Sequence, residues 1–424
     1  MLKQKKYINT ENQDKFKSVY KKTKLDNGLT VVTDEVPGAK SFSLGICVNA
    51  GSRNDLEGFF GTAHFLEHSS FKRTKNRNTK QIAVQFESIG AYTNAYTSKE
   101  LTCYYARALK NNFPKTLELM TDVVFNPVFL KKDVEKEKSV ILEEYYSVQD
   151  EPEDLIFDFA EEKTLGSAGL GHPILGDEKS IKNIGTEHLI NFFNNNYSPN
   201  NLIVSTAGAV SHQQTVDFLS KTSFSFPNNN RENNIIESQD YKKQLIVKKK
   251  KFNQSHIIFT NKIPGIMSDN RYIMNCLSTI LGDGMSSRLN LNIREKHGIA
   301  YNIYTTVQHY SDCGIFFIYA GTNTSNLSKI ENLIHTELDK IVNKSITNTE
   351  LSRAKEQIKS NLIISLENMS SRMQFNAKSE FMFKEKENLD TIIETIDSIN
   401  INHVKDAAIK YLNPEILSVF IFKS

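Results

Sequence analysis

The residues with the clearest chemical potential form the pentapeptide His64-Phe65-Leu66-Glu67-His68. Two histidines four residues apart on a helix lie one turn apart on the same face, so both imidazoles can reach one metal ion. Glu67 lies beside them and could take a proton from a water molecule held at that ion. The alternative is two unrelated helix histidines, and the pentapeptide alone does not exclude it.

A catalytic zinc ion needs a third protein ligand and an open fourth position, so a carboxylate from another element is expected. Periodicity over residues 131–149 predicts a helix on which Glu144 shares the apolar face with Glu137 and Val140, while Glu143 lies on the polar face. Two inward carboxylates need a cation or strong donors, and a zinc site meets that need. Pairing of both with lysine or arginine at a domain interface stays open as the alternative.

These candidate ligands need strands and helices to bring them together, and the first half of the chain supplies both. Asn27-Gly28 predicts the tight turn of a hairpin that leads into an alternating strand over residues 41–49. A period near 3.6 residues predicts helices, and β-branched and aromatic runs predict strands. The predicted helices cover residues 56–71, 80–89, 112–124 and 131–149, and the predicted strands lie within 92–108 and 201–208.

The second half repeats this order of elements, which indicates two homologous domains. We expect an α+β fold in which each domain is an antiparallel sheet with helices packed mainly on one face. The predicted strands are 256–260, 301–308 and 314–319, and the predicted helices are 271–281 and 325–342. The predicted units are an N-terminal extension (1–22), a zinc-binding catalytic domain (23–225), a polar linker (226–240) and a second repeat domain (241–424).

The His64–His68 motif, followed by Glu137–Glu144 on a later helix, resembles the pitrilysin family of zinc metallopeptidases, whose inverted HxxEH motif defines the inverzincins. The resemblance is closest to the short, processing-peptidase-like bacterial branch and covers nearly the whole chain. It implies one zinc ion per chain, bound by His64, His68 and Glu144. It also implies that Glu67 is the general base and Glu137 a carboxylate that supports a ligand.

The same resemblance implies roles outside the zinc motif. Arg294 and Tyr301 match the family's second-half signature, whose arginine and tyrosine contact substrate and stabilise the tetrahedral intermediate; without the resemblance they would be surface residues of a helix and a strand. Asn94, Ala95 and Tyr96 match an edge strand that pairs with substrate backbone, although a plain interior strand is the alternative. Ser69-Ser70 and Arg73 depart from the family's usual residues, so we expect a different packing and rim shape just after the ligand helix, with the ligands unchanged.

The amino-acid composition indicates which classes of binding partner to expect. The 52 basic and 49 acidic residues nearly balance, giving a net charge of +3, which argues against a nucleic-acid or membrane footprint. The basic run Lys248–Lys251 is either an anionic-ligand patch or a solvated strand start. No signal peptide, transit peptide or apolar span is evident, so a cytoplasmic location is expected. Four scattered cysteines predict buried thiols: Cys47, Cys103, Cys276 and Cys313.

Together these features predict a zinc-dependent endopeptidase that hydrolyses extended or unfolded peptides. Two alternatives are a catalytically silent structural or partner subunit of a heteromeric peptidase, and a scaffold or non-hydrolytic zinc protein in which the motif is coincidental. Long single-chain members of the family have four such domains around a closed chamber, whereas this chain has two. The resemblance therefore implies a homodimer in which Arg294 and Tyr301 act on the partner's zinc site.

Overall fold

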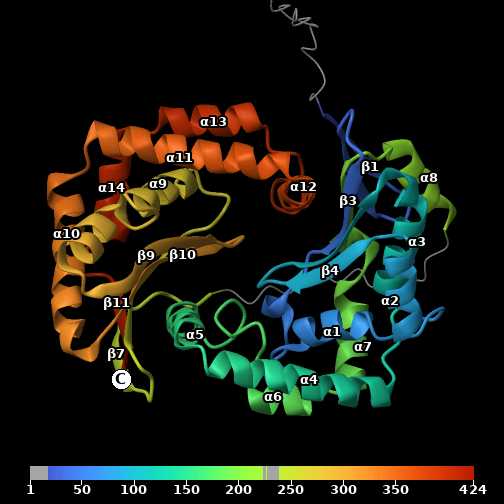
Figure 1. The fold of residues 1–424 in the computed structure, drawn as a ribbon, viewed down its shortest axis with the longest axis horizontal. Helices are drawn as coiled ribbons and strands as arrows, with labels where there is room; N and C mark the ends of the chain where they lie inside the picture. The colour runs from blue at the N-terminus through green and yellow to red at the C-terminus, as the bar shows by residue number, and fades with distance from the viewer. Residues whose placement is uncertain (1–17, 223–225, 227–237) are drawn as a thin grey trace, which may run out of the picture.

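The computed structural model describes residues 18–222, 226 and 238–424, which form two halves, each built on one sheet (Figure 1). The first sheet has the strand order β1-β2-β6-β3-β5-β4, and the second has the order β7-β11-β8-β10-β9. Most of the predicted linker lies outside the described residues. The strands are β1 (Val19–Lys24), β2 (Thr30–Glu35), β3 (Ser41–Val48), β4 (Tyr92–Thr97), β5 (Thr102–Leu109), β6 (Leu202–Gly208), β7 (Leu245–Lys249), β8 (Ser255–Pro264), β9 (Ala300–His309), β10 (Cys313–Thr322) and β11 (Ser418–Lys423).

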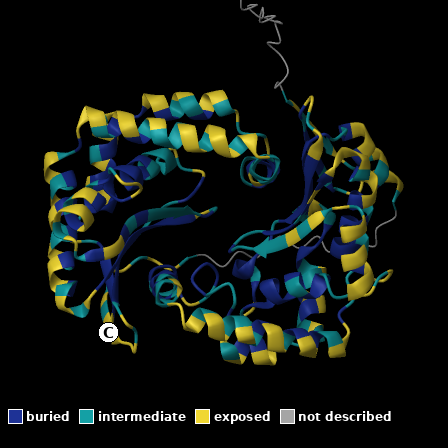
Figure 2. Cartoon of the chain, viewed as in Figure 1, coloured by how far each residue is buried: buried dark blue, intermediate teal, exposed yellow. Residues whose placement is uncertain are grey.

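Helices surround the sheets, and their outer faces are exposed while the strands are mostly buried (Figure 2). No helix in the described ranges has the length and apolar character that a membrane span requires. The first half contains α1 (Thr62–Ser70), α2 (Thr79–Ser88), α3 (Phe113–Phe125), α4 (Lys131–Gln149), α5 (Pro152–Leu165), α6 (Glu178–Asn183), α7 (Thr186–Asn196) and α8 (His212–Lys221). The second contains α9 (Arg271–Leu281), α10 (Leu327–Lys344), α11 (Asn348–Glu367), α12 (Met369–Phe383), α13 (Leu389–Ser398) and α14 (Ile401–Tyr411).

The two halves share one topology, which confirms the predicted α+β repeat. Without β1, the order β2-β6-β3-β5-β4 corresponds strand by strand to β7-β11-β8-β10-β9. Neighbouring strands are antiparallel except for one parallel pair in each sheet, β2 with β6 and β7 with β11. Helices α3 to α7 lie between β5 and β6, and α10 to α14 lie between β10 and β11. Helices α5 and α12 therefore occupy corresponding places in the repeat.

The two halves exchange these corresponding helices. Met373 and Ala377 of α12 pack on the first sheet in one cluster with Cys47, and Phe159 of α5 packs on the second sheet with Phe420. Each sheet is thus covered on one face by helices of its own half and on the other by a helix of the opposite half. The predicted packing on mainly one face describes each half alone, because amphipathic periodicity does not say which sheet a helix covers.

Two predicted boundaries need correction. The boundary at residue 23 falls inside β1, because Val19 to Lys24 pair with β2 across the Asn27-Gly28 turn. The helix predicted from residue 56 begins only at Thr62, since Gly58 and Gly61 have φ of 82° and 96°, which a right-handed helix cannot contain. The helices predicted over 131–149 and 271–281 are confirmed as α4 and α9. All four cysteines are free and buried, as predicted.

The exchange makes a prediction about stability. Met373 is 0% exposed in the first sheet's second core, and a Cβ on Gly45 would lie 2.3 Å from its sulfur. Met373→Ala should lower the free energy of unfolding by about 2–5 kcal/mol, because it leaves a cavity between the halves. Ile364→Ala on α11, where the side chain is 64% exposed, is the control and should change it by less than about 0.5 kcal/mol. Equal shifts of the urea midpoints would contradict this packing.

Candidate metal centre

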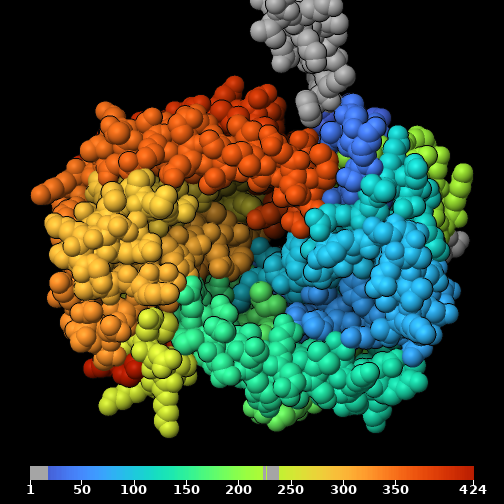
Figure 3. All heavy atoms as spheres, in the orientation of Figure 1, coloured from blue at the N-terminus to red at the C-terminus, as the bar shows by residue number. Residues whose placement is uncertain are grey.

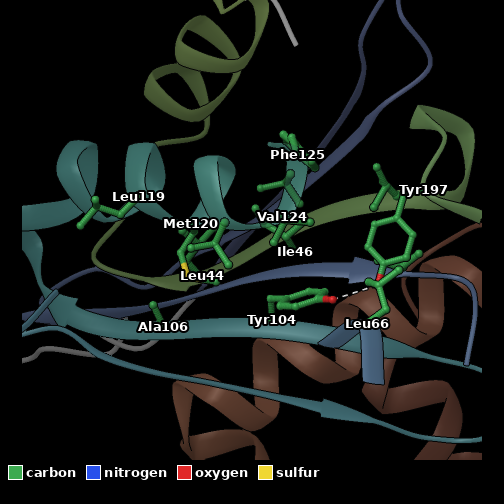
Figure 4. Packing of buried hydrophobic residues seen from close by; sticks show 14 of the residues in the cluster. Leu44, Ile46, Leu66, Tyr104, Ala106, Leu119, Met120, Val124, Phe125 and Tyr197 are labelled. Carbon is green, nitrogen blue, oxygen red and sulfur yellow. Dashed lines mark hydrogen bonds between the residues drawn. The ribbon is translucent and has the colours of Figure 1, made fainter. Parts of the chain in front are cut away.

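Helix α1 is held in place by its buried side and its first turn. Phe65 and Leu66 are 0% exposed, and Leu66 lies beside Tyr104, whose hydroxyl is 2.9 Å from that of Tyr197 (Figure 4). At the start of the helix, the two carboxylate oxygens of Asp55 accept the backbone N–H groups of Gly61 at 2.7 Å and Ala63 at 2.9 Å. The helix carrying the motif therefore has one defined position over the first core.

Three candidate ligands meet where α1 passes α4. One ligand atom from each of His64, His68 and Glu144 lies within 4.8 Å of the others. The Nε2 atoms of His64 and His68 are 3.8 and 3.7 Å from the Glu144 carboxylate oxygens, too far for direct hydrogen bonds. Donor atoms around a tetrahedral zinc ion stand about 3.4 Å apart, as follows from zinc–ligand bonds of about 2.0–2.2 Å. Two imidazoles and one carboxylate at this spacing fit a zinc ion.

The imidazole of His68 is oriented by a chain of polar contacts. Its Nδ1 lies 2.9 Å from Oε1 of Glu137, and Lys72 Nζ lies 2.7 Å from Oε2 of the same carboxylate. Burial opposes the ionised form of Glu137, but the contacts with His68 and Lys72 outweigh it and lower the pKa of Glu137. A charged Glu137 keeps the proton of His68 on Nδ1 and leaves Nε2 free to bind a metal.

His64 and His68 differ in their electrostatic surroundings. Burial lowers the pKa of His64 to about 3, so this imidazole is neutral and can bind a metal over the whole physiological range. Burial also disfavours charge on His68, but the contact with Glu137 and the nearby carboxylates of Glu67 and Glu144 raise its pKa. A proton on His68 therefore competes with a metal ion more strongly than a proton on His64 does.

Glu67 lies beside the three-donor group without belonging to it. Its side chain is 8% exposed, and Oε2 accepts a hydrogen bond of 2.6 Å from the Thr97 hydroxyl. Burial raises the pKa of Glu67, with the Thr97 contact opposing the shift. A buried carboxylate with a raised pKa, held next to a metal site, is suited to take up and return a proton.

The predicted ligand helix faces the site less completely than its apolar pattern suggested. Glu137 is 3% and Ile141 1% exposed, but Val140 on the same predicted face is 46% exposed. The Glu144 side chain is 42% exposed. Glu143, the preceding residue, is exposed and is not in the three-donor group.

The predicted substrate strand lies next to Glu67. Asn94, Ala95 and Tyr96 belong to β4, which forms one edge of the first sheet and pairs only with β5 among the described strands. The Ala95 N–H is bonded to its neighbour's side-chain Oδ1 at 2.9 Å, so it points away from β5. Tyr96 lines a cavity of about 1080 Å³ between the two halves, visible as a hollow in Figure 3. Thr97, the next residue, contacts Glu67.

Arg294 and Tyr301 are not brought to this site within one chain. Arg294 lies in the π-helical segment η4 (Asn290–Glu295), is exposed, and donates a 3.4 Å hydrogen bond to Asn290. Tyr301, near the start of β9, is 73% exposed. Within the described ranges, neither side chain hydrogen-bonds or ion-pairs with His64, His68 or Glu144.

Two residues of the centre escaped the sequence analysis. Lys72 lies beyond the end of α1 and of the predicted helix, so helical spacing did not place it, and a lysine is an unexpected neighbour for a cationic metal. Thr97 directly follows the predicted substrate strand, and no sequence rule assigns a threonine hydroxyl to a carboxylate in a distant helix. Both are found only because the fold brings α1, α4 and β4 together.

Comparisons with known proteins place these features in a family. Residues 30–178 match the family model described as Insulinase (Peptidase family M16), and residues 183–358 match the model described as Peptidase M16 inactive domain. A protein of Rickettsia felis named an uncharacterized zinc protease is 34% identical over 399 residues, covering 94% of this chain and 96% of its own. One of Bacillus subtilis, also named an uncharacterized zinc protease, is 32% identical, covering 92% of this chain and 94% of its own.

Solved structures with lower sequence identity share the fold. The crystal structure of a protease from Helicobacter pylori has a TM-score of 0.88 at 22% identity, covering 96% of this chain and 100% of its own. A structure titled peptidase M16 inactive domain, from Pseudomonas fluorescens, also has a TM-score of 0.88, at 19% identity, covering 95% of this chain and 97% of its own.

The geometry predicts different roles for two adjacent carboxylates. Glu144→Gln should weaken zinc binding by at least about tenfold, because it removes the anionic ligand, whereas Glu143→Gln should leave the affinity unchanged. Titration of both proteins with zinc against a competing chelator measures the difference. Equal zinc affinities of the two variants, or a weaker affinity for Glu143→Gln, would show that Glu144 is not the metal ligand on α4.

Proposed function

The chain belongs to peptidase family M16, and from this premise we propose that it is a zinc-dependent endopeptidase acting on extended or unfolded peptides. The predicted resemblance to the pitrilysin family is thereby confirmed at the level of the family. One observation carries the proposal: His64, His68 and Glu144 form a three-donor group with the buried carboxylate of Glu67 beside it. We assign one zinc ion per chain to this group.

The chemistry follows from the roles of the side chains. A bound zinc ion supplies acidification of a water molecule and polarisation of the peptide carbonyl. Glu67 takes the proton of the attacking water and later donates it to the leaving amine, and its burial and raised pKa suit both steps. Thr97 holds the Glu67 carboxylate in place. Glu137, supported by Lys72, keeps His68 in the tautomer that leaves Nε2 unprotonated.

We assign peptide binding to the edge of β4. The outward N–H of Ala95 is bonded to the Asn94 side chain, an interaction that a substrate carbonyl can replace when an extended peptide adds to the edge. The same strand ends at Thr97, which contacts Glu67. A peptide paired with β4 would therefore run toward the metal centre. This mode favours extended chains, because a folded substrate has its main-chain groups already bonded.

The competing function is a silent partner subunit, for which neither a complete ligand set nor a general base is required. The complete set of ligands and the supporting contacts of Glu137 and Thr97 favour catalysis. A scaffold with a coincidental motif would not need Lys72, Glu137 and His68 aligned toward one point.

The mechanism predicts that binding of zinc and hydrolysis can be separated. Glu67→Gln should retain stoichiometric zinc but lower kcat by at least about a hundredfold, since the amide cannot accept the proton. Cleavage of an unstructured peptide mixture, followed by mass spectrometry with and without a chelator, measures activity, and metal analysis measures zinc. A zinc-loaded variant with normal turnover would refute the role of Glu67. A wild-type protein that holds zinc but cleaves nothing would favour the silent subunit.

We further propose that the active form is a homodimer. Arg294 and Tyr301 are exposed and do not contact the three-donor group of their own chain, so a second copy can bring them to it. The presence of both sets on one chain favours two identical subunits over two different ones. In this arrangement each site takes its metal ligands from one subunit and its oxyanion-binding residues from the other.

The dimer predicts complementation between inactive variants. Glu67→Gln and Tyr301→Phe should each be inactive alone and recover roughly a quarter of wild-type activity when mixed, because half of the dimers are mixed and each has one intact site of two. Subunit exchange is verified by native mass spectrometry. Complete exchange without recovered activity would show that Tyr301 acts within its own chain or has no catalytic role.

A further inference from the structure

The outer edges of the two homologous sheets are protected differently. In the first sheet β2 is covered at its edge by β1, and the four central residues of β2 are buried. In the second sheet the corresponding strand, β7, lies at the edge with no further described strand beside it (Figure 1). Leu245 and Val247 of β7 are 67% and 54% exposed. Among the described strands, the second sheet therefore ends at β7, which carries exposed apolar side chains, whereas in the first sheet β1 covers the corresponding strand β2.

Among the described strands, none pairs with the outer edge of β7, which therefore presents main-chain groups to an added strand. The carbonyl of Gln244 and the N–H of Lys250 are bonded to β11, at 2.8 Å to Val419 N and 2.9 Å to Lys423 O. Because the main-chain groups of a strand residue point to one side and alternate along the strand, Leu245, Val247 and Lys249 direct their N–H and C=O groups outward. These three residues form a template onto which an extended chain can hydrogen-bond.

The same edge carries a concentration of positive charge. The six lysines of residues 242–251 are all exposed: Lys242, Lys243, Lys248, Lys249, Lys250 and Lys251. Three of them contact neutral groups in the described part of the chain, and the Glu162 carboxylate lies near Lys248. Lys248 and Lys250 lie over the rings of Phe159 and Phe422, and Lys243 donates to the carbonyls of Pro414 and Glu415. The chain as a whole has a net charge of only +3, so this cluster is a local excess.

In the first sheet one ion pair joins the added strand to the strand that it covers. Lys21 Nζ of β1 lies 3.1 Å from the Glu35 carboxylate at the end of β2. The other charged residues pair elsewhere, Asp34 with Arg372 and Lys386 and Lys22 with Glu380 of α12. At β7 the sheet strand is the basic one, so the complementary added strand is acidic.

We propose that the β7 edge, defined as residues 242–251, binds an extended acidic polypeptide segment as an additional strand of the second sheet. Outward residues of β7 supply main-chain hydrogen bonds, Leu245 and Val247 are covered by apolar side chains of the segment, and the lysines pair with its carboxylates. The β7 edge lies on the second sheet, whereas the metal centre lies in the first half.

Other occupants fit these observations less well. A second copy pairing through its own β7 would place two lysine-rich edges together, and like charges across adjacent strands are destabilising. A nucleic acid or an anionic membrane would use the lysines but not the outward main-chain groups of the strand. An acidic strand uses the charge, the apolar side chains and the hydrogen-bonding edge together.

The test measures binding of a fluorescein-labelled decapeptide of alternating glutamate and valine to the full-length chain with two changes: Glu67→Gln, which prevents cleavage of the probe, and Ala95→Pro, which removes the outward N–H of β4 and so prevents pairing there. Lys248→Glu with Lys250→Glu should weaken binding by about tenfold or more. The matched control is Lys131→Glu with Lys132→Glu on exposed positions of α4, which makes the same change in net charge and should leave binding unchanged. Equal weakening in both double variants would reduce the effect to overall charge and overturn the proposal.

Strand addition has its own readout. Val247→Pro removes one outward N–H without breaking a bond to β11, and proline is tolerated at such edge positions, so folding should persist while binding is lost. A probe with alternate amides N-methylated tests the same hydrogen bonds without altering the protein, and it should not bind. Retained binding of the methylated probe, equal binding of a lysine–valine probe, or preferential binding of a single-stranded oligonucleotide or phosphatidylglycerol vesicles would each overturn the proposal.

Discussion

A sheet with two apolar faces must be covered on both, and in this protein that requirement ties the two halves together. Leu44 and Val204 face the core formed by helices of the first half, whereas Cys47 and Ile203 face the other side and are covered by α12. In the same way, the second sheet is covered on one face by α5 of the first half. Neither half can bury its own sheet without the other, and burial of apolar surface is the main source of folding free energy.

The metal centre depends on this exchange. Glu144 lies near the end of α4, and α5, which is buried against the second sheet, begins at Pro152 only three residues after α4 ends. The helix that presents the third ligand is therefore held at one end by α1 and its contacts and at the other by the opposite half. Small shifts of α5 would move Glu144 relative to His64 and His68, whose donor atoms already lie at the spacing of metal ligands.

Patterns along the sequence predicted the features that depend on neighbouring residues alone. Periodicity located α4 and α9 because each has an apolar stripe over several turns. Spacing identified His64 and His68 as candidate ligands, and the helical face identified Glu144. The start of α1 was predicted too early because two glycines with positive φ precede it, and periodicity does not register them. The exchange of α5 and α12, the contact of Thr97 with Glu67 and the support of Glu137 by Lys72 depend on tertiary packing. No pattern along the chain contains that information.

Corresponding helices of the two halves have different roles, since α1 carries the polar metal-site residues and α9 is mainly a packing helix. Helix α1 buries His64 and Glu67 next to apolar residues, and such polar groups destabilise a core unless partners satisfy them, as Thr97 does for Glu67. Helix α9 follows the second sheet's β8 as α1 follows β3, and it contains no histidine, aspartate or glutamate. Its buried residues include Met274, Leu277 and Ile280. The first half thus carries the polar site at a cost in stability. The second half has an apolar helix in the corresponding place, and its packing against the first half holds the geometry of the site.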